Sequence, residues 1–176
     1  QMFTYKSQGK KITESMFDLF SRYEFTRDEW IAIKQKCDIE DILFLSTPQN
    51  RSDLDLLLEL GISAIKVGSD DFTNLSLLSD YSTTGLPMIV SCGMADMAEV
   101  YQALNVIGTF DGYPTVLLLC TSQYPTPPED VNLLKLKTLA NAFPDLILGF
   151  SDHTQGSLAS SLAVSFGAVF FEKHFT

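Results

Sequence analysis

Short apolar runs alternate with amphipathic stretches along most of the chain. The apolar runs lie at 42–46 (ILFLS), 64–68 (AIKVG), 87–91 (PMIVS), 115–120 (TVLLLC), 146–150 (LILGF) and 168–172 (AVFFE). Such runs are typical of strands that are buried on both faces. The stretches between them, at 51–61, 74–85, 95–108, 131–143 and 157–167, have the apolar spacing of helices. The pattern predicts six strands that alternate with helices.

Two further helices are predicted before the first strand. One lies around 14–23, and the other begins after Thr26, where Glu29 three residues later completes a capping box. Gly61 is expected to end the helix at 51–61, and Pro144 the helix at 131–143.

Repeated strand–helix units with apolar strands indicate an α/β fold with a parallel sheet. The repeat of roughly 20 to 30 residues matches a TIM (β/α)8 barrel, which needs about 250 residues for eight units. Six strands are two short, so we expect a partial barrel of about six βα units that lacks the first two. The alternative is an open doubly wound sheet. No repeat of another period and no linker divides the chain, which favours one domain over residues 1–176.

Polar residues follow each predicted strand, at the end of a parallel sheet where α/β barrels place their chemistry. They are Ser46 and Thr47; Lys66, Gly68 and Ser69; Ser91 and Gly93; Thr121, Ser122 and Tyr124; Ser151 and His153; and Glu172 and His174. Hydroxyl groups around one lysine suit a carboxylate or phosphate ligand. The two histidines of the chain stand at neighbouring strand ends. Two imidazoles in this arrangement predict an open metal site.

Each of these residues also has a structural interpretation. Ser46, Thr121 and Thr154 can simply cap the helices that follow, and a strand-end histidine can be a satisfied structural residue. Lys173 and Asp152 alternate out of phase with the candidate site residues, so both are expected to face the helix layer and to have no catalytic part.

Composition and charge exclude several classes of function. The chain is 45% hydrophobic and 19% charged, with no apolar run long enough for a membrane span. The formal net charge of −10 argues against a nucleic-acid partner. The N-terminal residues QMFTYKSQGKK do not have the pattern of a signal peptide and are expected to be an internal start. Cys37, Cys92 and Cys120 form no CxxC pair, which suits reduced, packed thiols in the cytoplasm.

Six strings, in order and each at a strand end, resemble the sialic acid synthase family. They are FLSTP, IKVGSDDFTNLSLL, PMIVSCGM, CTSQYPTPPEDVNL, GFSDHT and VSFGAVFFEKHFT, and the resemblance runs from about Ser15 to the last residue. The family comprises N-acetylneuraminate synthases and their legionaminic and pseudaminic acid relatives. It implies a TIM-barrel transferase that condenses phosphoenolpyruvate with an N-acylated amino sugar aldehyde, such as N-acetylmannosamine, and releases phosphate. It also implies a divalent metal, manganese or magnesium, a cytoplasmic location and a homodimer of the full-length protein.

The same resemblance assigns roles to individual residues. It implies that phosphoenolpyruvate is bound by Ser15, Thr47, Lys66, Ser69, Ser91, Ser122 and Ser151. It implies that His153 and His174 bind the metal and, with Lys66, serve catalysis. It places Tyr124 and Asp71 toward the sugar. Gln1 corresponds to a glutamine that follows the second strand in the family.

Several departures from the family pattern leave alternatives open. The acidic first-strand motif, a KFQ second strand and the C-terminal antifreeze-like domain do not occur in this chain, so the fragment alone is expected to be inactive. Asp71 stands at a position where glutamate is frequent in the family, and Leu119 stands at a position where many members have histidine. The alternatives are a non-catalytic sugar-binding or regulatory barrel, or another phosphoenolpyruvate-dependent aldol-type synthase.

Overall fold

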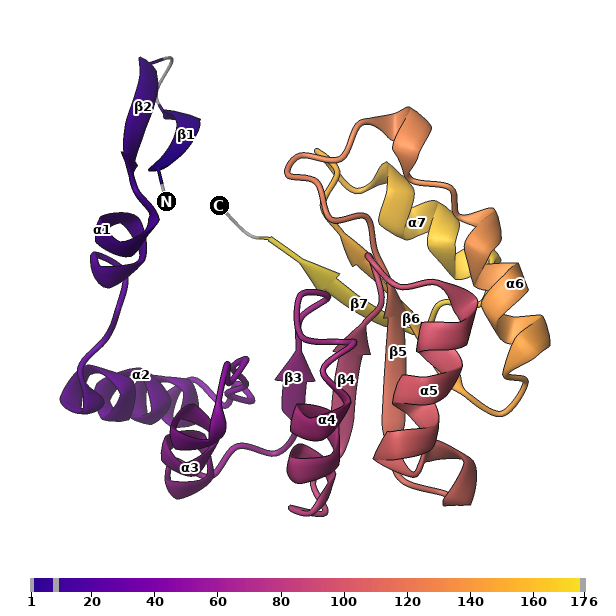
Figure 1. Cartoon of the computed structure of the whole chain (residues 1–176), viewed down its shortest axis with the longest axis horizontal. Coiled ribbons are helices and arrows are strands. Elements are labelled where there is room, and N and C mark those ends of the chain that lie inside the picture. The colour runs from indigo at the N-terminus through magenta and orange to yellow at the C-terminus, as the bar shows by residue number, and fades with distance from the viewer. Residues whose placement is uncertain (1, 8–9, 175–176) are drawn as a thin grey trace. The chain divides into compact units, whose positions relative to one another are not determined.

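Five parallel strands form the sheet that positions the candidate site. In the computed structural model they lie in the order of the sequence, each hydrogen-bonded to the next (Figure 1). They are β3 (Ile65–Val67), β4 (Met88–Ser91), β5 (Thr115–Leu119), β6 (Ile147–Asp152) and β7 (Phe170–Lys173). Sequential parallel strands require a crossover between neighbours, and the predicted helices supply these crossovers.

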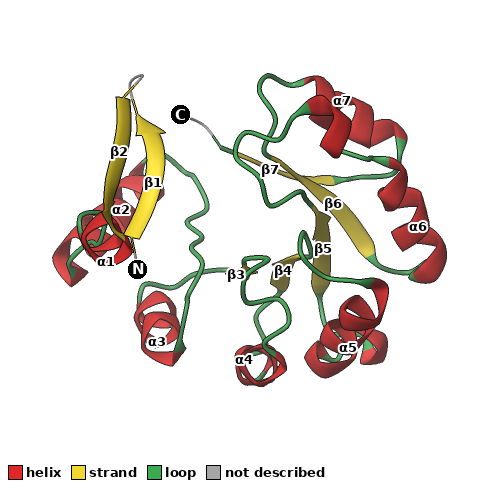
Figure 2. Ribbon diagram, turned by 45° about the horizontal axis from the view of Figure 1, so that its top comes forward, coloured by secondary structure: helices red, strands yellow, loops and turns green. Residues whose placement is uncertain are grey.

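The helices follow the predicted pattern. They are α3 (Arg51–Glu59), α4 (Leu75–Ser82), α5 (Met97–Ile107), α6 (Leu134–Ala142) and α7 (Leu158–Ser165), with short 3-10 helices at Thr109–Asp111 and Pro128–Asp130. Helices α4 to α7 cover one face of the curved sheet (Figure 2). A doubly wound sheet has helices on both faces and a point where the strand order reverses. This sheet has neither within the described chain, so the partial TIM barrel is confirmed over the doubly wound alternative.

Alternation along the strands gives the sheet two different faces. Residues Ile65, Val67, Met88 and Val90 are completely or almost completely buried and share the helix-covered face. On the other face, Ala64, Ile89 and Leu118 form a second apolar cluster. Gly149 belongs to this second face, where an added Cβ would lie 2.4 Å from Leu118 Cδ2 and 2.5 Å from the Phe170 carbonyl oxygen. Glycine is therefore needed at this position, because Leu118 of β5 and Phe170 of β7 leave no room for a Cβ atom.

The predicted strand at 42–46 does not form. Residues 43–49 have no regular secondary structure, and among the described residues no strand pairs with them. Phe44 is buried, but Leu43 is 78% exposed. The sequence interpretation was wrong here because an apolar run becomes a strand only where a partner supplies hydrogen bonds. The parallel sheet has five strands rather than six.

The structure describes residues 2–7 and 10–174, in two compact units, Gln1–Ile42 and Leu43–Thr176. The first unit contains an antiparallel hairpin that the sequence analysis did not predict. Its elements are β1 (Met2–Ser7), β2 (Lys10–Ser15), α1 (Met16–Ser21) and α2 (Arg27–Ile39). The capping box before α2 is confirmed, since the Glu29 backbone N–H donates to Thr26 Oγ1 and the Thr26 N–H donates to Glu29 Oε2. The single domain favoured by the sequence stays a prediction.

Both predicted helix ends are confirmed in the second unit. Gly61 follows α3 with φ +77°, a left-handed conformation that favours glycine, and α6 ends at Ala142, before Pro144. None of the helices in the described ranges combines the length and the apolar character that a membrane crossing requires.

Candidate functional site

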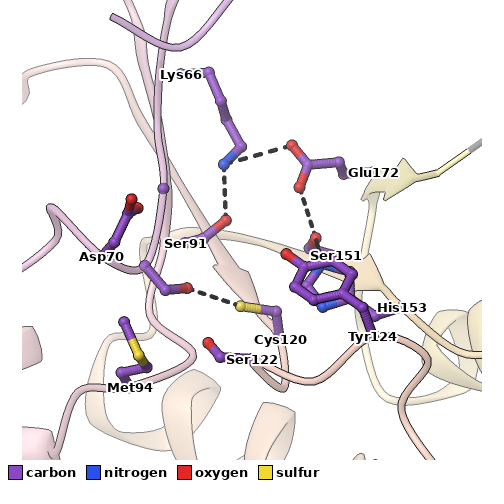
Figure 3. A pocket seen from close by; sticks show the side chains of 12 residues that line it. Lys66, Asp70, Ser91, Met94, Cys120, Ser122, Tyr124, Ser151, His153 and Glu172 are labelled. Carbon is purple, nitrogen blue, oxygen red and sulfur yellow. Dashed lines mark hydrogen bonds and ion pairs between the residues drawn. The ribbon is translucent and has the colours of Figure 1, made fainter. Parts of the chain in front are cut away.

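A cavity of about 290 Å³ lies at the carboxyl ends of the parallel strands (Figure 3). It is near the lower end of the volumes typical of small-molecule sites, roughly 300 to 1,000 Å³. Its lining residues are Lys66, Gly68, Ser69, Asp70, Ser91, Met94, Cys120, Ser122, Tyr124, Ser151, His153 and Glu172. The lining residues come from all five strands or the loops that follow them.

The strand register explains why polar side chains from distant parts of the sequence meet. Lys66 pairs with Ile89, and Ser91, two residues beyond Ile89, lies on the same face of the sheet. Ser151 of β6 pairs directly with Glu172 of β7. In a parallel sheet, paired residues point to the same side. These four polar residues therefore share the face that is not covered by helices.

Lys66 is the one cation among the residues that line the described cavity. Its Nζ donates to Ser91 Oγ at 2.9 Å and to the Val67 carbonyl oxygen at 3.0 Å. The ammonium group also lies 3.4 Å from Glu172 Oε2, and the Lys66 side chain is only 12% exposed. A half-buried ammonium group needs partners of this kind, so its charge is directed into the cavity.

Ser151 lies between Glu172 and His153, and its hydroxyl donates to Glu172. Ser151 Oγ lies 2.6 Å from Glu172 Oε1 and 3.1 Å from His153 Nε2. On the other side of the imidazole, His153 Nδ1 lies 2.7 Å from the Thr121 carbonyl oxygen. A carbonyl oxygen only accepts, so Nδ1 carries the proton and donates to Thr121. In the neutral ring, Nε2 then has a free lone pair.

The two histidines converge, as the sequence predicts. Their ring centroids are 5.3 Å apart, with the rings tilted by 60°. The Tyr124 ring stacks on His153 at 4.0 Å and meets His174 edge-on at 5.1 Å. The Thr126 backbone N–H donates to the His153 carbonyl oxygen at 2.9 Å. This bond ties the loop after β5 to the end of β6 and holds Tyr124 over the imidazole.

The chemistry of the two histidines fits a divalent metal. Burial is the main cause that lowers the pKa of His153, and the neighbouring His174 acts in the same direction, so the imidazole favours the neutral form that binds metals. An Nδ1–H that donates to a carbonyl is the usual outer-shell support for a ligand that binds through Nε2. Within the described ranges, no cluster of three or more His, Cys, Asp or Glu residues is arranged to hold a metal. A metal at this pair would need its remaining ligands from water, substrate or elsewhere.

A second group of side chains packs around Gly93. The Gly93 N–H donates to Ser69 Oγ at 2.9 Å, and Ser69 Oγ lies 3.1 Å from Cys120 Sγ. Burial raises the pKa of Cys120, and it raises the pKa of Cys92 to about 12. Both thiols are therefore protonated, as expected for packed cysteines.

The predicted helix-facing orientation of Asp152 and Lys173 is confirmed. Asp152 is fully buried; Lys173 Nζ lies 3.0 Å from its carboxylate, and Ser160 Oγ of α7 donates to it at 2.6 Å. Burial alone would raise the pKa of Asp152, but hydrogen bonds from Ser160, Thr154 and Lys173 outweigh it, and the pKa is lowered. This pair fastens β6 and β7 to α7 and belongs to the packing of the unit.

The structure brings most of the predicted site residues into one place. Those that line the cavity are Lys66, Ser69, Ser91, Ser122, Tyr124, Ser151 and His153, and His174 lies beside them. Asp71 is not among the lining residues; burial and then the neighbouring Asp70 raise its pKa. Thr47 lies in the irregular segment before α3. Ser15 caps α1 in the first unit by accepting from the Phe17 N–H, and Gln1 lies outside the described residues.

Two carboxylates of the cavity were not assigned a role from the sequence. Glu172 was recognised as a strand-end residue only, although it alternates in phase with Phe170 on the face that carries Ser151. Asp70 was passed over in favour of its neighbour Asp71. Its carboxylate folds back over Gly68, where an added Cβ would lie 2.3 Å from Asp70 Oδ1. Gly68, two residues before Asp70, is the sequence feature that could have indicated this conformation.

Sequence comparison connects the chain with a family of known proteins. The sequence model of the NeuB family matches residues 1–176. An uncharacterized protein of Methanocaldococcus jannaschii, MJ1065, is 39% identical over 160 residues, which are 91% of this chain and 47% of that protein. The N,N'-diacetyllegionaminic acid synthases of Legionella pneumophila and Campylobacter jejuni are 34% and 39% identical, over 98% and 93% of this chain. Each match covers 49% of the synthase.

Solved structures agree with these matches. The N-acetylneuraminic acid synthetase of Leptospira borgpetersenii, in complex with citrate, superposes with a TM-score of 0.85 at 34% identity, over 90% of this chain and 55% of that one. A truncated 3-deoxy-D-arabino-heptulosonate 7-phosphate synthase of Thermotoga maritima has a TM-score of 0.68 at 16% identity, which concerns the fold alone. The chain spans about half the length of the relatives that it matches.

Proposed function

The chain belongs to the NeuB family, and we propose that the protein carrying it condenses phosphoenolpyruvate with an N-acylated amino sugar aldehyde. The reaction consumes one water and yields a nonulosonic (sialic) acid and inorganic phosphate. The observation that carries the proposal is the convergence of Lys66, serines from successive strand ends and the His153 imidazole on one cavity, with the His174 ring 5.3 Å from that of His153. Relatives of similar sequence named as legionaminic acid synthases support the same class of reaction.

The donor is held, in this proposal, by the cation and hydroxyl groups of the cavity. Phosphoenolpyruvate carries a carboxylate and a phosphate, and both accept hydrogen bonds from ammonium and hydroxyl groups. Lys66 supplies the charge, and Ser69, Ser91, Ser122 and Ser151 surround it with hydroxyl groups. The local cation explains how an anion binds to a chain whose formal net charge is −10.

The imidazoles of His153 and His174 would hold a divalent metal, manganese or magnesium. Such a metal, when bound, supplies Lewis-acid polarisation of a carbonyl oxygen. The protein's own part is to keep His153 neutral and oriented, through its bond to the Thr121 carbonyl and the stacked Tyr124 ring. In this proposal the acceptor aldehyde lies near the two rings and the donor near Lys66, so that the enol carbon of the donor can form the new carbon–carbon bond.

The acceptor sugar would meet Tyr124 and Asp71 of the β3–α4 loop. Burial is the main cause that raises the pKa of Tyr124, so its hydroxyl stays protonated and can donate to a sugar oxygen. Asp71 keeps its predicted role toward the sugar. Ser15 and Thr47 keep their predicted roles toward the donor. A homodimer and a cytoplasmic location are part of the same proposal.

The test is product formation by the protein that the complete gene encodes. Incubation with phosphoenolpyruvate, manganese and N-acetylmannosamine or another N-acyl amino sugar is expected to release phosphate and to give a product with the mass of a nonulosonic acid. Release is expected to stop with a chelator and in His153→Ala. A product of different mass would indicate another phosphoenolpyruvate-dependent synthase. Sugar binding without any phosphate release would favour the non-catalytic barrel.

A further inference from the structure

We propose that Glu172 is an internal occupant of the donor's anion site and that the donor displaces it on binding. The inference rests on the proposed function only for the identity of the anion as phosphoenolpyruvate. Its structural basis is that one carboxylate holds two of the groups that would bind the donor. Glu172 thereby lowers the affinity of the site for every anion that needs Lys66, and only a ligand with further contacts offsets this cost.

Glu172 contacts the same side-chain atoms of Lys66 and Ser151 that a bound substrate carboxylate would contact. Its Oε1 accepts from Ser151 Oγ at 2.6 Å, and its Oε2 lies 3.4 Å from Lys66 Nζ (Figure 3). The two oxygens of one carboxylate therefore bridge the cation and a hydroxyl group of the cavity. A substrate carboxylate that binds to the same pair cannot do so while Glu172 remains.

The position of Glu172 allows the carboxylate to leave. Its side chain is 36% exposed in the described chain. The neighbouring pair on the opposite face is different: Asp152 is fully buried and is held by Ser160, Thr154 and Lys173. The Asp152–Lys173 ion pair is therefore a fixed structural contact. The Glu172–Lys66 ion pair lies at the edge of a cavity, where a ligand can replace the carboxylate.

The contact decides which anions can bind. A monoanion such as pyruvate would exchange one carboxylate for another at Lys66 and gain little from it. Phosphoenolpyruvate brings a phosphate as well, which gains further hydrogen bonds from hydroxyl groups that Glu172 does not use, such as Ser69 and Ser122. Displacement of Glu172 costs the same free energy for each anion that needs Lys66, so only a ligand with further contacts, such as the doubly anionic donor, still binds with useful affinity.

The test compares anion binding by Glu172→Gln with binding by the matched variant Asp70→Asn, in the protein encoded by the complete gene. Both substitutions remove one negative charge from the cavity lining, but Asp70 forms no ion pair within the described part of the chain. Titration calorimetry with phosphoenolpyruvate, inorganic phosphate and pyruvate supplies the dissociation constants. Glutamine retains the shape of the side chain and an oxygen that accepts from Ser151.

We expect Glu172→Gln to bind phosphoenolpyruvate about five- to tenfold more tightly than the wild type, and to bind pyruvate more tightly by a similar factor. Asp70→Asn is expected to change either affinity less than about twofold. Glu172→Ala provides the same comparison should the glutamine variant not fold. Unchanged or weaker phosphoenolpyruvate binding by a folded Glu172 variant would overturn the inference, as would an equal gain in Asp70→Asn.

The outcomes separate this inference from the proposed function. Wild-type binding of phosphoenolpyruvate without a gain in Glu172→Gln contradicts the displacement alone. A gain for inorganic phosphate and pyruvate, with no phosphoenolpyruvate binding in any variant, supports the displacement and contradicts the donor. Absence of binding for all three anions in every variant contradicts both.

Discussion

At the scale of single residues, Gly93 occupies a position in the site where three neighbouring side chains leave no room for a Cβ atom. A Cβ at Gly93 would lie 2.6 Å from Cys120 Sγ, 2.8 Å from Ser122 Oγ and 3.0 Å from Ser69 Oγ. These side chains come from the loop after β3 and the loop after β5, and they meet over the loop after β4. The absence of a side chain at Gly93 is what allows the hydroxyl groups of the cavity to approach one another.

Gly93→Ala is therefore expected to weaken phosphoenolpyruvate binding about tenfold or more, because the serine hydroxyls are pushed from their positions. Calorimetry measures the affinity, and a thermal melt checks that the protein still folds. The double variant Gly93→Ala, Cys120→Ala removes the nearest colliding atom and is expected to recover part of the loss. Wild-type affinity in folded Gly93→Ala would show that this packing does not support the donor site.

Most candidate residues could be predicted from the sequence because strand-end positions in a parallel sheet converge. Lys66, Ser91, Ser151 and His153 follow this rule and lie together. Glu172 could not be assigned a role, because its importance depends on the pairing register that brings it opposite Ser151. The register of neighbouring strands is a tertiary property that periodicity within one strand does not contain.

At the scale of elements, one buried carboxylate joins β6, β7 and α7. Ser160 of α7 donates to Asp152 of β6, and Lys173 of β7 pairs with the same carboxylate. The pKa of Asp152 is lowered, so its charged form is stabilised in the folded state relative to the unfolded chain. This contribution is complete above the unfolded pKa of about 3.9 and is lost as the pH falls through the lower folded value.

Ser160→Ala is expected to reduce the free energy of unfolding by about 1 to 3 kcal/mol, because it removes a hydrogen bond to a buried charge. The adjacent Ser161→Ala is the matched control: Ser161 Oγ donates only to the exposed Ser157 carbonyl oxygen of the turn before it, and a change within about 0.5 kcal/mol is expected. Urea unfolding at neutral pH and below about pH 4 measures both, and the Ser160 effect should shrink at low pH. Equal effects of the two substitutions would contradict the role of Asp152.

Helices and strands could be predicted where the local hydrophobic pattern agreed with the strand pairing of the folded sheet. The helices α3, α4 and α5 carry clear apolar stripes, and the five paired strands carry largely apolar runs. The run at 42–46 has the same local character as these strands but finds no described partner. The hairpin of β1 and β2 was missed because its strands are polar and alternate weakly. Hydrogen-bond partners, rather than propensity, decided both cases.

At the scale of the whole molecule, the second unit is a sector of a barrel, with its chemistry at one end. Five strands in sequential order place consecutive loops side by side, which is why residues from 66 to 172 reach one cavity. The same architecture leaves β3 and β7 each with one unpaired edge within the described sheet. The relatives are about twice as long as this chain, so the complete protein is the proper object for every functional measurement.

In the proposed reaction, the cavity at the carboxyl ends of β3 to β7 binds phosphoenolpyruvate through Lys66. Calorimetric titration of phosphoenolpyruvate into the complete protein, the Lys66→Met variant and the Lys137→Met variant tests it most directly. Lys137 lies on the exposed side of α6 and contacts Phe166 by a cation–π interaction at 5.5 Å, away from the cavity. We predict wild-type binding in Lys137→Met and at least a hundredfold loss in Lys66→Met. Equal binding by all three proteins, or no binding by the wild type, would contradict the account.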